Sequence, residues 1–168
     1  MDARSDVIVR RAGRDDATEI ARLALEVQAV HVAARPDIFK PGGGETASEI
    51  AERIDAAGER YWVALIDEHT VGYAYARVID EPDTRWKYAM RTVLLDQMGV
   101  DARHRSRGIG ERLWRAVHDG AVADGATRVV LSVWSFNPDA RRFYERLGFT
   151  SFHERMAVEL TDSVHHAR

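Results

Sequence analysis

The sequence predicts a single α/β (α+β) domain over residues 1–168, in which a mixed sheet carries helices on both faces. Short apolar runs rich in β-branched residues alternate with segments in which apolar residues recur at helical spacing. The length suits one domain, and no linker or internal repeat interrupts the chain. The expected order of elements is β-α-α-β-β-β-α-β-α-β.

The N-terminal half begins with a short strand and two helices. Asp15 or Asp16 is expected to cap the first helix, and Pro36 ends it because proline disfavours helix in the residue before it. The expected elements are a strand at 7–10, a helix from 17 to the break at Pro36, a loop at 36–46, a helix at about 46–57, and strands at 61–66 and 71–79.

The C-terminal half carries stronger boundary residues. Gly125 suits the left-handed end of a helix, and Asn137-Pro138-Asp139 is a typical helix start. The expected elements are a polar connection at 80–87, a strand at 92–100, a helix from 109 to about 124, a strand at 129–134, a helix from 138 to about 147, a strand at 149–160 and a frayed tail at 161–168.

Composition excludes several classes of function. The net charge of −3 gives no basic field for nucleic acid, and the absence of cysteine excludes disulfides and thiolate metal sites. The seven histidines lack metal-ligand spacing, so no metal is expected. No apolar run approaches the roughly 18 residues of a membrane span, and the N-terminus has no signal-peptide pattern, so a cytoplasmic protein is expected.

Residues 105–110, Arg-Ser-Arg-Gly-Ile-Gly, are the most informative stretch of the chain. They lie between an expected strand and an expected helix, where two glycines allow a tight turn and the first helical N–H groups can bind an anion. The alternative is a plain turn decorated with surface arginines. The stretch lacks the third glycine of the dinucleotide loop and the Lys-Ser/Thr of the triphosphate loop.

From about Leu94 to Leu160 the chain resembles the GNAT superfamily of acyl-CoA-dependent N-acetyltransferases. The family's pyrophosphate loop, [QR]-x-x-G-x-[GA], matches Arg105, Gly108 and Gly110. A valine five residues before the loop and an Asn…Tyr…Leu-Gly-Phe pattern after it also match, at Val100, Asn137, Tyr144 and 147–149. The resemblance implies the GNAT fold and acetyl-CoA as co-substrate.

The resemblance also implies which residues bind acetyl-CoA. Backbone groups near Met98, Gly99 and Val100 would bind the pantetheine and polarise the thioester, on a bulged strand that splays from the next one. Gly99 fits a bulge or a close backbone approach, or else it makes room for a neighbouring side chain. Asn137 would bind the pantetheine arm as well as cap its helix. The pyrophosphate would lie on Arg105, Ser106, Arg107, Gly108, Ile109 and Gly110, with Arg103 and Arg112 within possible reach of the phosphates.

Two catalytic residues follow from the same resemblance. Tyr144 would donate a proton to the leaving thiolate, because a phenol stays protonated near neutral pH; the alternative is core packing. Asp96 is the carboxylate available as general base on the strand before the loop, unless it only faces solvent or pairs with an arginine. Ser132 occupies the other position where some members carry a Glu. Deprotonation through water, with no dedicated base, is a further alternative.

The expected reaction is acetyl transfer to a primary amine, either a small molecule or a peptide. The alternative is a non-catalytic acyl-CoA sensor, whereas nucleic-acid binding is disfavoured by the acidic net charge. Many family members form homodimers, so a homodimer is a family-level expectation. Candidates for the acceptor pocket are His31, Arg35, Asp37, Trp86, Tyr88 and Trp134.

Overall fold

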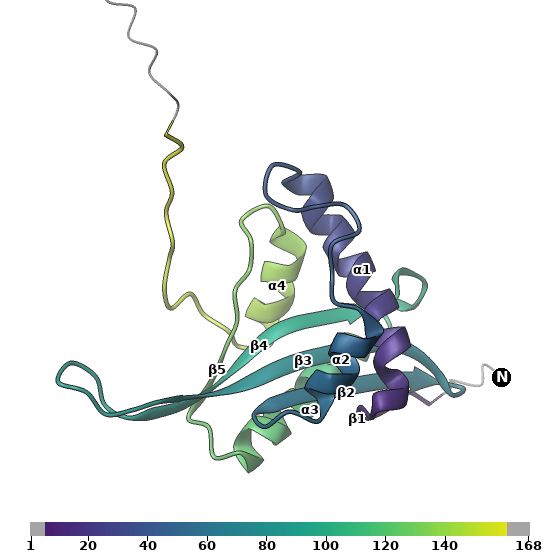
Figure 1. Ribbon diagram of the computed structural model, residues 1–168, viewed down its shortest axis with the longest axis horizontal. Helices are drawn as coiled ribbons and strands as arrows, with labels where there is room; N and C mark the ends of the chain where they lie inside the picture. The colour runs from purple at the N-terminus through teal and green to yellow at the C-terminus, as the bar shows by residue number, and fades with distance from the viewer. Residues whose placement is uncertain (1–5, 161–168) are drawn as a thin grey trace, which may run out of the picture. The chain divides into compact units, whose positions relative to one another are not determined.

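The computed structural model describes residues 6–160, and the chain divides into two compact units, residues 1–136 and 137–168. The first unit contains a five-stranded sheet in the order β1-β2-β3-β4-β5 (Figure 1). Its elements are β1 (Ile8–Arg11), α1 (Ala17–Ala34), α2 (Ala47–Ile54), β2 (Glu59–Ile66), β3 (His69–Glu81), β4 (Met90–Val100), α3 (Ile109–Ala123) and β5 (Arg128–Val130). Neighbouring strands are antiparallel except β4 and β5, which are parallel, so the expected mixed sheet is confirmed.

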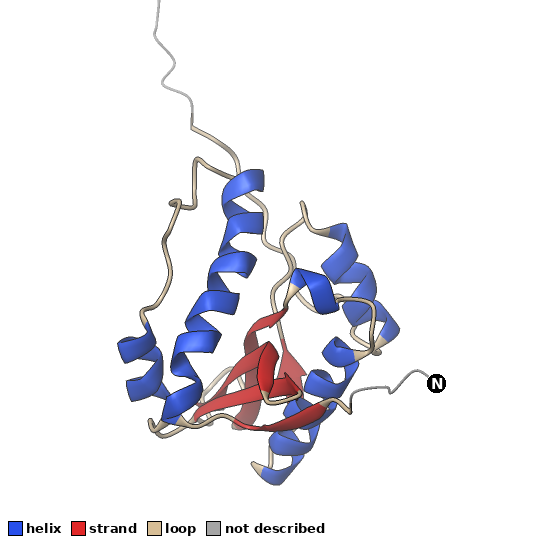
Figure 2. Ribbon diagram, turned by 90° about the vertical axis from the view of Figure 1, so that its right-hand side faces the viewer, coloured by secondary structure: helices blue, strands red, loops and turns tan. Residues whose placement is uncertain are grey.

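Helices cover both faces of this sheet (Figure 2). Alternate residues of a strand point to opposite faces, and the contacts follow that period. Tyr61 and Tyr73 belong to a buried cluster with Ile20 of α1 and Ile50 of α2. On the opposite face, a Cβ added to Gly72 would lie 3.2 Å from Leu113 of α3. The sheet is therefore buried on both sides, as the apolar runs of its strands predict.

The start of α1 differs from the expectation. A 3-10 turn, η1 (Arg14–Asp16), precedes the helix, and the Asp16 side chain makes no capping bond to it. The Asp16 carboxylate instead accepts a 2.8 Å hydrogen bond from the Gly13 N–H and pairs with Arg10 at 2.7 Å. The prediction of an Asp16 cap was wrong because the turn gives Asp16 a helical backbone conformation. Its side chain therefore interacts with residues that precede it and not with the first N–H groups of α1.

The second unit contains α4 (Pro138–Arg146). Asn137 caps this helix, and its side chain accepts a 3.1 Å hydrogen bond from the Ala140 N–H. The expected strand at 149–160 is wrong, because these residues do not adopt strand structure and are nearly all exposed. A strand needs a neighbour for its backbone groups, which alternating side chains alone do not supply. The expected tail at 161–168 lies outside the described residues.

Two further expectations are modified. The strand expected at 129–134 is only β5, residues 128–130, because its pairing with β4 ends at Leu94↔Val130. The helix expected at about 46–57 ends at Ile54, and Thr46 caps it in a reciprocal pair with Glu49. Between residues 6 and 160, no helix combines the length and the apolar character needed to cross a membrane.

Candidate functional site

Strand β4 carries a bulge and loses its parallel neighbour halfway along. Tyr75 pairs with Gln97 and Ala76 with Leu95, so Asp96 is the extra residue at the bulge. The pairing with β5 covers only Thr92–Leu94. From Asp96 to Val100, β4 is therefore paired on one side only within the described chain. This is the splayed arrangement that the family resemblance implies.

Gly99 is not the bulge residue. It pairs in register with Tyr73, and a Cβ at this position would lie 2.7 Å from Cγ2 of Val27 and 2.9 Å from Cε1 of Tyr73. Both distances are shorter than carbon atoms tolerate. The contacts therefore favour the alternative stated above, that glycine at this position makes room for neighbouring side chains.

The loop that follows β4 turns sharply into α3. Ser106 and Gly108 have φ values of +61° and +76°, in the left-handed region that favours glycine. Gly108 is the N-cap of α3, and a Cβ on it would meet nothing within 4 Å. Residues 105–108 are exposed. The first N–H groups of α3 have no intrahelical partner, so this open loop can bind an anion through its backbone.

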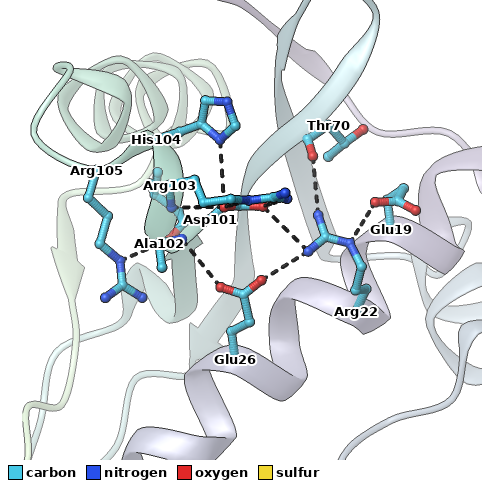
Figure 3. A network of polar contacts seen from close by, with 10 residues as sticks. Glu19, Arg22, Glu26, Thr70, Asp101, Ala102, Arg103, His104 and Arg105 are labelled. Carbon is cyan, nitrogen blue, oxygen red and sulfur yellow. Dashed lines mark hydrogen bonds and ion pairs between the residues drawn. The ribbon is translucent and has the colours of Figure 1, made fainter.

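A buried carboxylate anchors the start of the loop. Asp101 accepts hydrogen bonds from the Arg103 N–H at 2.9 Å and from Arg103 Nη2 at 2.8 Å (Figure 3). The Arg103 guanidinium holds the pKa of Asp101 well below its usual range. Arg22 of α1 lies 3.6 Å from Asp101 and 2.9 Å from Glu26, which accepts a 3.4 Å hydrogen bond from the Ala102 N–H. This network ties the loop to α1.

Three arginines around the loop have partners within the protein. Arg103 is bound to Asp101, Arg105 Nε donates to the Val100 carbonyl at 3.1 Å, and Arg112 Nη1 donates to the Val7 carbonyl at 3.2 Å. The terminal nitrogens of Arg105 remain directed away from these contacts (Figure 3). Phosphate binding by Arg103 would compete with its ion pair to Asp101.

Asp96 is exposed and lies near an arginine. Its Oδ1 is 3.7 Å from Nη2 of Arg77 on the neighbouring strand β3. The bulge therefore places a carboxylate next to the unpaired stretch of β4. Its solvent exposure and its arginine neighbour also match the non-catalytic alternative, so its role as base stays a prediction.

Sequence reasoning missed a charged pocket of about 480 Å³ on the α2 side of the sheet. It is lined by Glu49, Glu52, Arg53, Ala56, Glu59, Tyr75 and Arg77. Arg53 Nη1 donates a 3.0 Å hydrogen bond to the Tyr75 hydroxyl, and Arg53 Nη2 lies 2.5 Å from Glu45. Burial, followed by the hydrogen bond with Glu59, raises the pKa of Tyr75. A charged residue within an otherwise apolar strand, such as Arg77 in β3, is the sequence feature that could have indicated this pocket.

The expected acceptor-pocket residues separate into three groups. His31 and Trp134 join one aromatic cluster, in which Phe39 contacts both rings, with centroids 5.0 and 5.3 Å away. The His31 Nδ1 is also 2.9 Å from the Val27 carbonyl, as expected for a helix-end histidine. Arg35 and Asp37 form an ion pair with each other. Trp86 and Tyr88 lie exposed in the β3–β4 connection.

The second unit carries the other two predicted site residues. Asn137 caps α4, and Tyr144 lies seven residues further along the chain. The Tyr144 ring contacts Phe143 and Phe149, with centroids 5.3 and 5.6 Å away. Burial raises the pKa of Tyr144 to about 12. The phenol is therefore protonated at neutral pH, as a proton donor must be.

The chain is similar in sequence to known acetyltransferases. The model of the acetyltransferase (GNAT) family matches residues 24–149. Human N-acetylaspartate synthetase is 37% identical over 92 residues, which cover 55% of this chain and 28% of that protein. Human N-acetyltransferase 8 is 33% identical over 104 residues, covering 62% of this chain and 42% of that protein. The chain therefore spans well under half the length of these curated relatives.

Solved structures share the fold. A protein from Bacillus halodurans superposes with a TM-score of 0.86 at 26% identity, covering 92% of this chain and 99% of that one. An aminoglycoside N-acetyltransferase in complex with CoA superposes with a TM-score of 0.73 at 16% identity, covering 96% and 99%. Within residues 6–160, no three His, Asp or Glu side chains are grouped to hold a metal ion.

Proposed function

Because the chain belongs to the acetyltransferase (GNAT) family, and is an acyltransferase by that membership, we propose that it transfers the acetyl group of acetyl-CoA directly to a primary amine. The observation that carries the proposal is that β4, within the described chain, has a free edge next to the loop that follows it. The strand loses its parallel partner after Leu94, and it then leads into the loop of residues 105–110 at the start of α3, of which residues 105–108 are exposed. One continuous segment thus offers backbone groups to both ends of an acyl-CoA.

The donor half of the site follows this segment. The N–H groups of Gly108, Ile109 and Gly110 bind the pyrophosphate, because they lie at the N-terminus of α3 and carry its positive dipole. The backbone edge of residues 98–100 that faces away from β3 binds the pantetheine amides and the thioester carbonyl. The side chain of Asn137 adds a contact to the pantetheine arm.

The acid–base roles fall to Asp96 and Tyr144. Acetyl-CoA supplies a thioester that a neutral amine attacks without a covalent enzyme intermediate. Asp96 accepts the proton that the amine loses, either directly or through water, because it is an exposed carboxylate at the bulge. Tyr144 donates a proton to the departing sulfur, since burial keeps its hydroxyl protonated.

The names of relatives and structural neighbours indicate acceptors of different chemistry. N-acetylaspartate synthetase is named for an amino acid, and one structural neighbour is an aminoglycoside N-acetyltransferase. The acceptor of this chain must therefore be inferred from its own residues.

The test follows thiol release from acetyl-CoA over a broad panel of amines and peptides. We expect Tyr144→Phe to lower kcat by about 100-fold or more while acetyl-CoA binding is unchanged. The matched control is Tyr88→Phe, which removes a hydroxyl from an exposed ring. Acetyl-CoA binding without turnover on any acceptor would favour a sensor instead.

A further inference from the structure

The charged pocket beside α2 has the position of an acceptor site. It is an open surface depression with a volume of about 480 Å³ and a mostly charged lining. It lies between α2 and the strands β2 and β3, which α2 covers (Figure 1). Arg77, one of its lining residues, contacts Asp96 at the bulge of β4. The pocket therefore reaches the bulge of β4, which immediately precedes the segment 98–100 to which the proposed function assigns the thioester.

Three neighbouring strands place a row of alternating charges beside this pocket, in which Asp96 reaches Arg77 diagonally because the direct β4 partner of Arg77 is Leu94. Glu59 of β2 is the direct register partner of Arg77 of β3. Asp96 of β4 lies on the other side of Arg77, at 3.7 Å. Neighbouring strands are about 4.8 Å apart, so the backbones of Glu59 and Arg77 lie about one strand spacing from each other. From β2 to β4 the charges are therefore negative at Glu59, positive at Arg77 and negative at Asp96.

The charges of this row are poorly satisfied within the protein. Arg77 Nε and Glu59 Oε2 are shielded from solvent and neither of these two atoms has a hydrogen-bond partner among residues 6–160, although the Glu59 carboxylate also interacts with the Tyr75 hydroxyl. The Arg77–Asp96 contact is long, whereas Arg53 in the same pocket already has partners at 2.5 and 3.0 Å. Buried polar groups without partners are costly. Arg77 and Glu59 therefore gain by turning toward a ligand that supplies the missing groups.

A ligand that satisfies both residues must supply an anionic group for Arg77 and a cationic group for Glu59. A ligand with only an ammonium would leave Arg77 unsatisfied, and a ligand with only a carboxylate would leave Glu59 unsatisfied. We propose that this pocket binds an amino-acid-type zwitterion as the acetyl acceptor, with its carboxylate on Arg77 and its amino group between the flanking carboxylates of Glu59 and Asp96. A carboxylate and an amine on one carbon match an arginine that has a carboxylate on each neighbouring strand. The role of the amino acid as acetyl acceptor rests on the proposed function, whereas its binding in the pocket does not.

The first experiment uses the unaltered protein and matched sets of amines. Each set contains an α-amino acid, its amide and its decarboxylated amine, and thiol release from acetyl-CoA is measured for each. The twenty common amino acids supply the side chains. We expect kcat/KM for at least one amino acid to exceed that of its amide and its decarboxylated amine by 10-fold or more. Equal or faster turnover of the forms without a carboxylate would overturn the proposal.

Variants then assign the preference to Arg77. Arg77→Gln is expected to raise KM for the preferred amino acid roughly 10- to 100-fold, with little change in KM for its amide, because a charge-assisted bond is lost. Glu59→Gln is expected to raise KM for both, since both carry the amine. Arg91→Gln, which removes an exposed arginine paired with Asp80, is the control and should change neither. If Arg77→Gln does not fold, Arg77→Lys keeps the charge without the forked geometry and should raise the same KM by a smaller factor.

Calorimetric titration of the amino acids separates failure of this inference from failure of the proposed function. Amino-acid binding that Arg77→Gln or Arg77→Lys weakens would uphold the pocket even if no amine is acetylated. Turnover of amines with no dependence on a carboxylate would uphold the function and reject the pocket. Neither binding nor turnover would reject both.

Discussion

The carboxylate of Asp101 and the guanidinium of Arg103 lie 2.8 Å apart, two residues from each other, at the point where β4 gives way to the loop. The Asp101 side chain also receives the Arg103 N–H, so it caps the 3-10 turn η2 (Ala102–His104). Because Asp101 is buried and Arg103 is exposed, the pair orders the loop from its inner side and leaves residues 105–108 open to solvent.

We expect Asp101→Ala to destabilise the protein and to weaken acetyl-CoA binding. Removing the carboxylate leaves the Arg103 N–H without its partner and Arg22 with less neutralising charge, at a cost of about 1–3 kcal/mol. Urea unfolding measures the stability, and titration with acetyl-CoA measures the affinity. Asp119→Ala, at an exposed position on α3, is the control. If both variants are equally stable, Asp101 does not anchor the loop.

The same carboxylate predicts a dependence of stability on pH. The pKa of Asp101 is lowered in the folded protein, so the unfolded chain binds its proton first as the pH falls. The stabilisation is therefore fully present above the unfolded pKa of about 3.9 and is lost as the pH falls below it toward the folded pKa. The difference in unfolding free energy between the wild type and Asp101→Asn should be constant near neutral pH and shrink below about pH 4. A difference that grows with acid would contradict this assignment.

Gly99→Ala should destabilise the fold through a clash between α1 and the sheet. The new Cβ would lie 2.7 Å from Val27 and 2.9 Å from Tyr73, and overpacking of this kind costs about 1–3 kcal/mol. Val27→Ala removes one of the two opposing groups. Chemical unfolding of the double variant should therefore show a smaller loss than the sum of the single variants. Additive losses would place the strain elsewhere.

Apart from the Asp16 cap, features that depend on residues close in sequence were predicted well. The left-handed glycines at 108 and 125, the Asn137 cap and the break before Pro36 each follow from local backbone chemistry. These features include the loop, which is why the candidate donor site could be found without a structure.

Features that depend on partners far along the chain were predicted poorly. Alternating side chains at 149–160 indicate a strand, but a strand forms only where a neighbouring strand pairs with its backbone, and these residues do not adopt strand structure. The sequence left open whether Gly99 marks a bulge or makes room for a side chain, because the neighbour that decides the question, Val27, lies 72 positions earlier. The charged pocket depends on the register that places Glu59 opposite Arg77, which no local pattern reveals.

Gly108→Asp should weaken acetyl-CoA binding by at least about 10-fold, because it places a negative charge at the N-terminus of α3, where the pyrophosphate is proposed to bind. A Cβ at Gly108 meets nothing within 4 Å, so steric exclusion within the protein does not contribute. Gly108→Asn has nearly the same shape without the charge, and both side chains tolerate left-handed backbone.

Gly125 provides the second control, because it has a similar φ of +72° and equally open surroundings, and it lies beyond the far end of α3. Gly125→Asp should therefore leave acetyl-CoA affinity unchanged. Isothermal titration in low and high salt measures the affinity, and the charge effect at Gly108 should diminish as salt screens it. If Gly108→Asp and Gly108→Asn bind acetyl-CoA equally well, no anion lies at this turn, and the pyrophosphate must bind elsewhere.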